Sequence, residues 1–205
     1  MIALIKIVGL GPGSHDAITA QTLREIENSK HRFIRTTRHP SAHLVKNATS
    51  FDDEYEKHDK FEDVYQAIAD KLIAAATQHQ EILYVVPGSP LVLEHTVQLL
   101  LKNNSVTTTI LPAMSFLDVV WSTLQIDPVD AGVRMIDGHR FAELAAGQTG
   151  PLLVAQCHAN WVMSNIKLAH ESATGDEPVV ILHHLGLSDE KIIHTTWQNL
   201  SLIHI

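Results

Sequence analysis

Three turns rich in glycine or proline follow apolar runs in this sequence, and their residue types suit the binding of a ligand. They read IVGLGPG (7–13), YVVPGSPLV (84–92) and TILPAMSF (109–116). If the apolar runs are parallel strands, the turns gather at one edge of a sheet, where open α/β folds bind ligands. Glycine also permits unusual backbone angles and a close approach to a bound molecule. We therefore expect the three turns to line one site.

The first turn does not match the established phosphate-binding loops. Gly9 and Gly11 fit the dinucleotide pattern G-x-G-x-x-G, but Ser14 holds the third position and Gly13 comes one residue early. The next predicted strand is not followed by the acid that holds a ribose, and the turn lacks the lysine of a Walker loop. Arg35 or Arg38 could bind a 2′-phosphate, so an NADP enzyme is a minor alternative.

Fourteen histidines invite a metal hypothesis, which the spacing does not favour. His39 and His43 are four residues apart, but no third ligand or H-E-x-x-H pattern accompanies them. His183 and His184 are neighbours in a predicted strand, where successive side chains point to opposite faces. They are therefore not expected to serve one site, and we predict no metal centre.

The first half of the chain alternates short β-like runs with longer helical patterns, which predicts a parallel sheet covered by helices. The run at 81–86 is typical of a buried strand, and apolar residues in 61–76 repeat at helical spacing. We expect Ser14 or Asp16 to cap the first helix. The predicted strands are 2–8, 32–36, 81–86 and 106–111. Two helices are predicted after the first turn and after Pro40, and three more at 61–76, 91–102 and 116–124. A polar connection is predicted at 49–60.

The alternation of predicted strands and helices ends at Pro128 and Gly132, and the remaining predicted strands are separated by fewer residues. Short links between the last three favour an antiparallel meander. We therefore predict an α/β fold of two subdomains, 1–112 with a mainly parallel sheet and helices on both faces, and 113–205 with a mixed sheet and the meander. The predicted strands of the second part are 133–136, 151–157, 178–184, 191–197 and 200–205.

Composition narrows the function classes. The chain has 205 residues and a formal net charge of −8, so a nucleic-acid-binding surface is not expected. Cys157 is the single cysteine, which excludes an internal disulfide. No apolar run reaches the roughly 18 residues of a membrane span. The first residues read as a strand and a turn rather than a signal peptide, so we expect a cytoplasmic protein.

Taken together and in this order, the three turns resemble those of the tetrapyrrole (corrin/porphyrin) methylases, the class III S-adenosylmethionine methyltransferases. The resemblance covers nearly the whole chain and implies two α/β subdomains with the methyl donor in the cleft between them, and a homodimer. A narrower resemblance is to the methylase-like half of bacterial fusion proteins that carry a MazG-type nucleotide pyrophosphohydrolase domain at the C-terminus. The segments that carry it are RTTRHP (35–40), SFDDEYEK (50–57), FEDVYQAI (61–68), VVPGSPLVLEHTVQLL (85–100) and LGLSDEKI (185–192).

The family resemblance also implies which residues contact S-adenosylmethionine, and it implies that the second turn does so mainly through backbone groups. The second turn of the family usually reads Gly-Asp-Pro, whereas this chain has serine in the middle; the usual Pro-Gly of the third turn is Pro112-Ala113; and Ser14 stands where an aspartate is common. The implied contacts are Leu10, Gly88, Ser89, Pro90, Val92, Ser115, Phe116 and Cys157.

Methyl transfer mainly requires that the acceptor be positioned next to the methyl group, because displacement from a sulfonium is in line and has a good leaving group. A general base is optional, so the catalytic residue stays unknown; the candidates are Asp16, His39, Asp118 and His158. We expect a methyltransferase that acts on a small molecule, a tetrapyrrole or another anionic compound. The alternative is a non-catalytic ligand-binding or regulatory module associated with a nucleotide pyrophosphohydrolase domain or partner.

Overall fold

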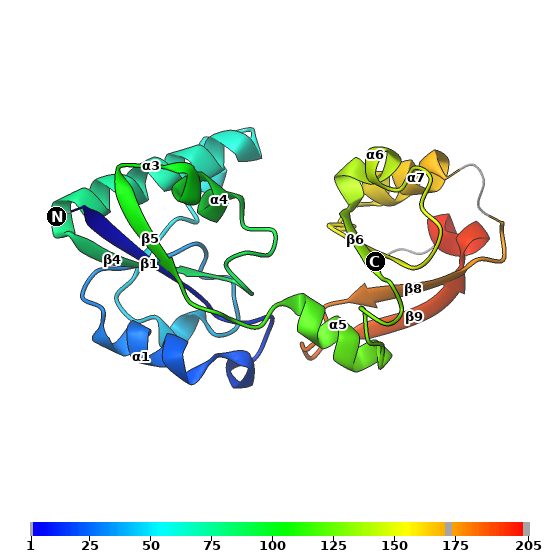
Figure 1. Cartoon of the computed structure of the whole chain (residues 1–205), viewed down its shortest axis with the longest axis horizontal. Helices are drawn as coiled ribbons and strands as arrows, with labels where there is room; N and C mark the ends of the chain where they lie inside the picture. Colours follow the sequence, from blue (N-terminus) through cyan, green and yellow to red (C-terminus); the bar gives the residue numbers. More distant parts are fainter. Residues whose placement is uncertain (1, 171–173, 203–205) are drawn as a thin grey trace. The chain divides into compact units, whose positions relative to one another are not determined.

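A five-stranded parallel sheet organises the first part of the chain (Figure 1). In the computed structural model, which describes residues 2–170 and 174–202, the strand order is β3-β2-β4-β1-β5 and every neighbouring pair is parallel. This arrangement confirms the predicted α/β fold class. The strands are β1 (Ala3–Gly9), β2 (Arg32–Ile34), β3 (Thr49–Ser50), β4 (Glu81–Val86) and β5 (Val106–Ile110).

The central strands are buried on both faces. In β4, Ile82 and Tyr84 belong to one hydrophobic cluster, whereas Leu83 and Val85 belong to another. Both faces of a parallel sheet must be covered, since crossover helices pack on each side. The helices α3 (Phe61–His79) and α4 (His95–Lys102) cover one face, and α1 (Ala20–Asn28) covers the other (Figure 1).

The chain divides into two compact units, Met1–Val119 and Val120–Ile205, and α5 (Phe116–Leu124) belongs partly to each. In the second unit the strands pair in both directions, as the sequence predicts, but in two separate two-stranded sheets. One pair is parallel and the other antiparallel. The elements are β6 (Arg134–Asp137), α6 (Phe141–Leu144), β7 (Leu152–Ala155), α7 (Asn160–Ala169), β8 (Pro178–His183) and β9 (Lys191–Thr196).

Two predicted helix starts are wrong. Thr19 caps α1, because its side chain accepts a hydrogen bond from the backbone N–H of Thr22 at 3.1 Å. Ser14 instead precedes a short 3₁₀ turn, η1 (His15–Ala17), without a side-chain capping bond. The helix α4 begins at His95 rather than at residue 91, because the second turn continues to residue 94 and holds Leu93 at φ +58°.

Several elements escape the sequence analysis. The predicted polar connection at 49–60 contains β3 and a one-turn helix, α2 (Glu54–Lys57). The predicted helix after Pro40 is a 3₁₀ turn, η2 (Ala42–Leu44). The helix α7 is absent from the sequence prediction, although Val162 and Ile166 are buried at helical spacing.

The predicted final strand is also wrong where the structure describes it. Residues Trp197–Leu202 form a 3₁₀ segment, η4, and residues 203–205 lie outside the described part of the chain. Leu200 is buried from this segment, so its alternating apolar pattern reflects a turn that packs on the unit rather than a strand. No helix in the described residues is long and apolar enough to cross a bilayer.

Candidate functional site

The three glycine- and proline-rich turns meet at the carboxyl edge of the first sheet. Because β1 lies between β4 and β5, the turns that follow these strands are neighbours. The backbone N–H of Leu10 donates to the carbonyl of Val86 at 2.9 Å. One residue further on, Gly11 and Gly88 exchange hydrogen bonds, with Gly88 N–H to Gly11 O at 2.9 Å and the reverse bond at 3.3 Å. The first and second turns therefore form one hydrogen-bonded unit.

Gly9 is the point at which all three turns come together. A methyl group on its Cα would overlap the carbonyl oxygen of Gly88 in the second turn. It would also lie 2.8 Å from the Cβ of Ala113 in the third turn and 3.0 Å from the Cδ of Pro90. Glycine is required here by the close approach of the neighbouring backbone.

Glycine is favoured at position 88 for a different reason. Its φ is +62°, a left-handed conformation that side chains rarely adopt, and nothing lies within 4 Å of where its Cβ would point. The second turn therefore presents open backbone beside Gly88. A bound molecule can approach the main chain there without displacing a side chain.

The remaining residues predicted to contact the donor differ in exposure. Leu10 is fully buried in the cluster beneath the sheet, which leaves only its backbone for a ligand. Pro90 is buried against Gly9, while Ser89, Val92 and Phe116 are half-buried.

Ser115 serves first as the cap of α5. Its hydroxyl oxygen accepts from the N–H of Leu117 at 3.1 Å, and the carboxylate of Asp118 accepts from the Ser115 N–H at 2.7 Å. This reciprocal pattern is a capping box with aspartate in the acidic position. The carboxylate of Asp118 is thereby engaged in fixing the third turn, which weakens its case as a general base.

His39 and Ser41 fasten the first turn from the loop after β2. The ring nitrogen Nδ1 of His39 accepts from the N–H of Ser41 at 3.2 Å, so the proton of the neutral ring lies on Nε2. Nε2 then donates to the carbonyl of Gly11 at 2.9 Å, and the Ser41 hydroxyl donates to the carbonyl of Gly13 at 3.1 Å. Burial lowers the pKa of His39, which favours this neutral form. His39 is therefore a positioning residue for the turn.

An ion pair that sequence reasoning missed holds the far end of the second turn. Arg35 follows β2, and its Nη1 donates to Oε1 of Glu94 at 2.7 Å. Burial raises the pKa of Glu94 to about 7, and the guanidinium of Arg35 opposes that rise. The bond to Glu94 engages Arg35, which leaves Arg38 as the other candidate for a 2′-phosphate in the NADP interpretation. The available sequence signal for a buried ion pair was Glu94 itself, a single acid within the apolar segment LVLEHTV.

Cys157 belongs to the second unit, where it is half-buried two residues after the end of β7. Burial raises the pKa of its thiol to about 11, with a smaller contribution from Asp137. The thiol is therefore protonated at neutral pH, and it is a poor nucleophile.

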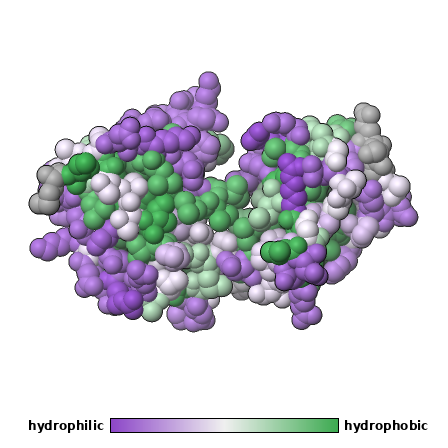
Figure 2. Space-filling model, viewed as in Figure 1, coloured by the Kyte–Doolittle hydropathy of each residue, from purple (hydrophilic) through white to green (hydrophobic). Residues whose placement is uncertain are grey.

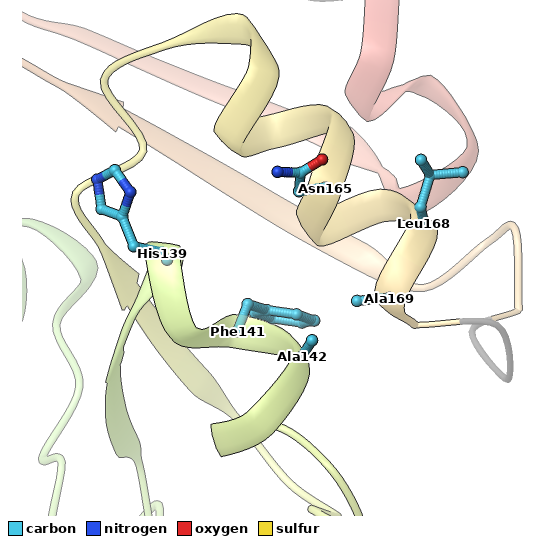
Figure 3. A pocket seen from close by; sticks show the side chains of 7 residues that line it. His139, Phe141, Ala142, Asn165, Leu168 and Ala169 are labelled. Carbon is cyan, nitrogen blue, oxygen red and sulfur yellow. The ribbon is translucent and has the colours of Figure 1, made fainter.

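Two other general-base candidates are exposed. Asp16 lies 3.1 Å from the ring of His15, and His158 packs beside His139 with ring centroids 5.3 Å apart. His139 also borders a hollow of about 360 Å³ between α6 and α7 of the second unit (Figure 3). The residues that line this hollow are Gly138, His139, Phe141, Ala142, Asn165, Leu168 and Ala169, none of which is a predicted donor contact.

Exposed apolar side chains occur in the turns of the first unit. Leu91 and Leu93 in the second turn and Met114 in the third are all more than two-fifths exposed. Figure 2 shows apolar surface on the first unit, bordered by polar residues. Exposed apolar side chains in a turn with open backbone are typical of ligand-binding sites.

The expectation that His183 and His184 cannot serve one site is wrong. β8 ends at His183, and His184 has φ +49°, so the alternation of side chains stops between them. The two rings stack with centroids 3.7 Å apart. The other histidine pair considered as metal ligands differs, because each ring bonds to a separate backbone carbonyl: His39 to Gly11 and His43 to Pro40.

Replacing Gly9 with alanine tests the meeting point of the turns. We expect Gly9→Ala to lower the free energy of unfolding by about 3 kcal/mol, because the new methyl group overlaps backbone that cannot move without breaking the strand edge. Gly88→Ala should cost only about 1 kcal/mol, since it adds left-handed strain but meets no atom. Urea denaturation measures both values. Equal costs for the two variants would contradict the close approach at Gly9.

The buried Glu94 should make stability depend on pH. Its folded pKa of about 7 exceeds the unfolded value, so the folded state holds the extra proton and stability falls as pH rises from 5 to 8. We expect this fall to be about 2 kcal/mol larger in the wild-type chain than in Glu94→Gln, which cannot titrate. Denaturant unfolding at pH 5 and pH 8 measures the difference. The same fall in both proteins would show that Glu94 does not titrate in this way.

Comparisons with known proteins agree with this architecture. The sequence model of the tetrapyrrole (corrin/porphyrin) methylases matches residues 5–201. The uncharacterized protein YabN of Bacillus subtilis (strain 168) is 35% identical over 200 residues, which are 94% of this chain and 40% of that protein. This chain therefore spans well under half the length of that curated relative.

Solved structures show the same fold at low sequence identity. A uroporphyrin-III C-methyltransferase from Thermus thermophilus has a TM-score of 0.72 and 18% identity, covering 98% of this chain and 86% of its own. A second structure of this kind, complexed with S-adenosylhomocysteine, has a TM-score of 0.66 and 14% identity, with 98% and 87% covered. Diphthine synthase has a TM-score of 0.68 and 16% identity, with 98% and 85% covered. Since the family match extends over almost all of the chain, this protein belongs to the tetrapyrrole (corrin/porphyrin) methylases, a family of S-adenosylmethionine-dependent methyltransferases.

Proposed function

We propose that this chain transfers a methyl group from S-adenosylmethionine to a small molecule and that the three turns of the first unit hold the donor. The observation that carries the proposal is the open backbone beside Gly88, at the edge where Gly9 draws all three turns together. Family membership supplies the chemical class of the ligand.

The residues of the turns fit such a donor. Gly88 leaves room for an approach to the main chain, and the half-buried Ser89, Val92 and Phe116 offer a hydroxyl and apolar surface around it. The side chain of Leu10 is in the core and its N–H is bonded to Val86, so its contribution is limited to its backbone carbonyl. Cys157, the eighth expected contact, is a neutral thiol that can pack against a ligand but does not attack it.

When bound, S-adenosylmethionine supplies a sulfonium methyl group that a nucleophile displaces in line. The chain needs to orient the acceptor about 3 Å from that methyl group and to exclude water. His39 and Asp118 hold the turns in place through their hydrogen bonds and are not available as bases in this arrangement. The proposal therefore assigns catalysis to positioning, without a general base from these two residues.

The acceptor that we propose is a tetrapyrrole or another anionic small molecule. Arg38 is exposed in the loop after β2, close in sequence to the residues that fasten the first turn. It offers an exposed positive charge in a chain whose formal net charge is −8. The homodimer and the pyrophosphohydrolase partner implied by the sequence resemblance stay predictions.

A second candidate is a module that binds the donor without transferring its methyl group. Two observations favour it: Ser89 replaces the usual acid of the second turn, and the chain spans 40% of YabN, so the relative has other regions that such a module can regulate. Both candidates require a donor site in the turns. They differ in turnover, which radioactive methyl transfer to candidate acceptors detects.

Substitution of Gly88 with asparagine tests the donor site. Asparagine tolerates positive φ, so Gly88→Asn should fold, but its side chain enters the open space beside the turn. We expect S-adenosylhomocysteine to bind the wild-type chain and to bind Gly88→Asn about tenfold more weakly or worse. Isothermal titration calorimetry measures both affinities.

Gly132→Asn provides the matched control. Gly132 has φ +64° and equally open surroundings, but it lies outside the three turns. This variant should bind S-adenosylhomocysteine like the wild type. An absence of binding to the wild-type chain at about 1 mM ligand would sink both candidate functions. Unchanged binding by Gly88→Asn would show that the donor does not bind at the second turn.

A further inference from the structure

The loop between β8 and β9 brings three metal-ligating side chains together in the second unit. β8 ends at His183, which pairs with Lys191 at the start of β9 (Figure 1). His184 and Asp189 lie in the loop between them. Within the described residues, these three form a group whose ligand atoms all lie within 4.8 Å of one another.

The backbone of the loop explains why the histidines converge. An uninterrupted strand would send His183 and His184 to opposite faces. Instead, the left-handed φ of +49° at His184 turns its side chain toward that of its neighbour, and the rings stack at 3.7 Å with an interplanar angle of 22°. A non-glycine residue in this conformation carries strain of about 1 kcal/mol or more, which the surrounding contacts must offset.

Other hydrogen bonds hold the loop in this shape. His184 Nδ1 lies 2.6 Å from Oδ2 of Asp189, and the N–H of Gly186 donates to Oε2 of Glu190 at 2.7 Å. The N–H of Leu187 also donates to the carbonyl of His184 at 3.0 Å. The backbone that carries the three ligands is therefore ordered by contacts within the loop.

We propose that His183, His184 and Asp189 form a binding site for a divalent transition-metal ion, for which Zn²⁺ is the reference. Two imidazole nitrogens and one carboxylate oxygen suit Zn²⁺ and related borderline ions, whereas Mg²⁺ and Ca²⁺ prefer sets of oxygen ligands. His184 and Asp189 are exposed and His183 is half-buried, so the ion can enter from solvent. The three side chains leave a coordination position for water or an external ligand.

Coordination requires only side-chain adjustment. Ligand atoms of a tetrahedral zinc site lie about 3.3 Å apart, which follows from bonds of about 2.0 Å. The half-buried His183 and the exposed His184 and Asp189 can reach this separation by rotation about their χ angles, without movement of the strands. The ion then replaces the 2.6 Å hydrogen bond between His184 and Asp189. An exposed His–Asp ion pair alone contributes little to stability, about 0 to 1 kcal/mol, and it does not involve His183. The metal site gives all three residues a common role, independent of the methyl-donor site in the first unit.

The test is a zinc titration of the 205-residue chain without a histidine tag. We expect one equivalent of Zn²⁺ to bind in competition with a chromophoric chelator, and Mg²⁺ at the same concentration not to displace it. His184→Ala and Asp189→Asn should each weaken this binding by about tenfold or more, since each removes a ligand. Circular dichroism of each variant verifies that the fold is retained.

His194→Ala is the matched control. His194 is an exposed histidine on β9 of the same hairpin, opposite Val180, and is not part of the cluster. Its replacement should leave the tight equivalent unchanged, and it reports on weak binding by the other histidines of the chain. Two results overturn the proposal: no saturable 1:1 binding by the wild type, or the same affinity in His184→Ala as in His194→Ala.

Discussion

The absence of a side chain at Gly9 permits the backbone of three turns to meet at one edge of the first sheet. Gly88, Pro90 and Ala113 all lie within about 3 Å of the position that a Cβ would occupy. The contact depends on the strand order, since only the strand between β4 and β5 can reach both neighbouring turns. The candidate donor site is therefore a consequence of close backbone packing rather than of any catalytic side chain.

Much of the first unit can be predicted from its sequence, because its signals are local. The buried strands are continuous apolar runs, and α3 has its apolar residues at helical spacing. The helix α7 also has a local signal but was missed, whereas other elements that escaped prediction depend on packing with distant parts of the chain. β3 has two residues and forms by pairing with β2, and the segment ending at Leu202 buries Leu200 from a 3₁₀ turn although its alternation resembles a strand.

The candidate site was predictable at the level of its turns but not of its supports. Glycine and proline mark the turns directly, whereas the Arg35–Glu94 pair joins residues that are 59 positions apart. The hydrogen bond between His39 and Gly11 spans 28 positions and likewise leaves no local pattern. The prediction that His183 and His184 point to opposite faces was wrong for another reason. Side chains alternate between faces only inside a strand, and β8 ends between these two residues.

The departures of this chain from the usual family turns can be understood from the same backbone packing. Where the resemblance leads us to expect glycine, the chain has Ala113, and the Cβ of that alanine occupies space that Gly9 leaves empty. Ser89 replaces an expected acid, but the features that open the second turn, Gly88 with its positive φ and the bonds to Gly11, do not involve that side chain. A donor that is held mainly by backbone groups tolerates both changes. Under the proposed function, we therefore expect the substitutions to affect the acceptor and the rate of transfer more than the capacity to bind the donor.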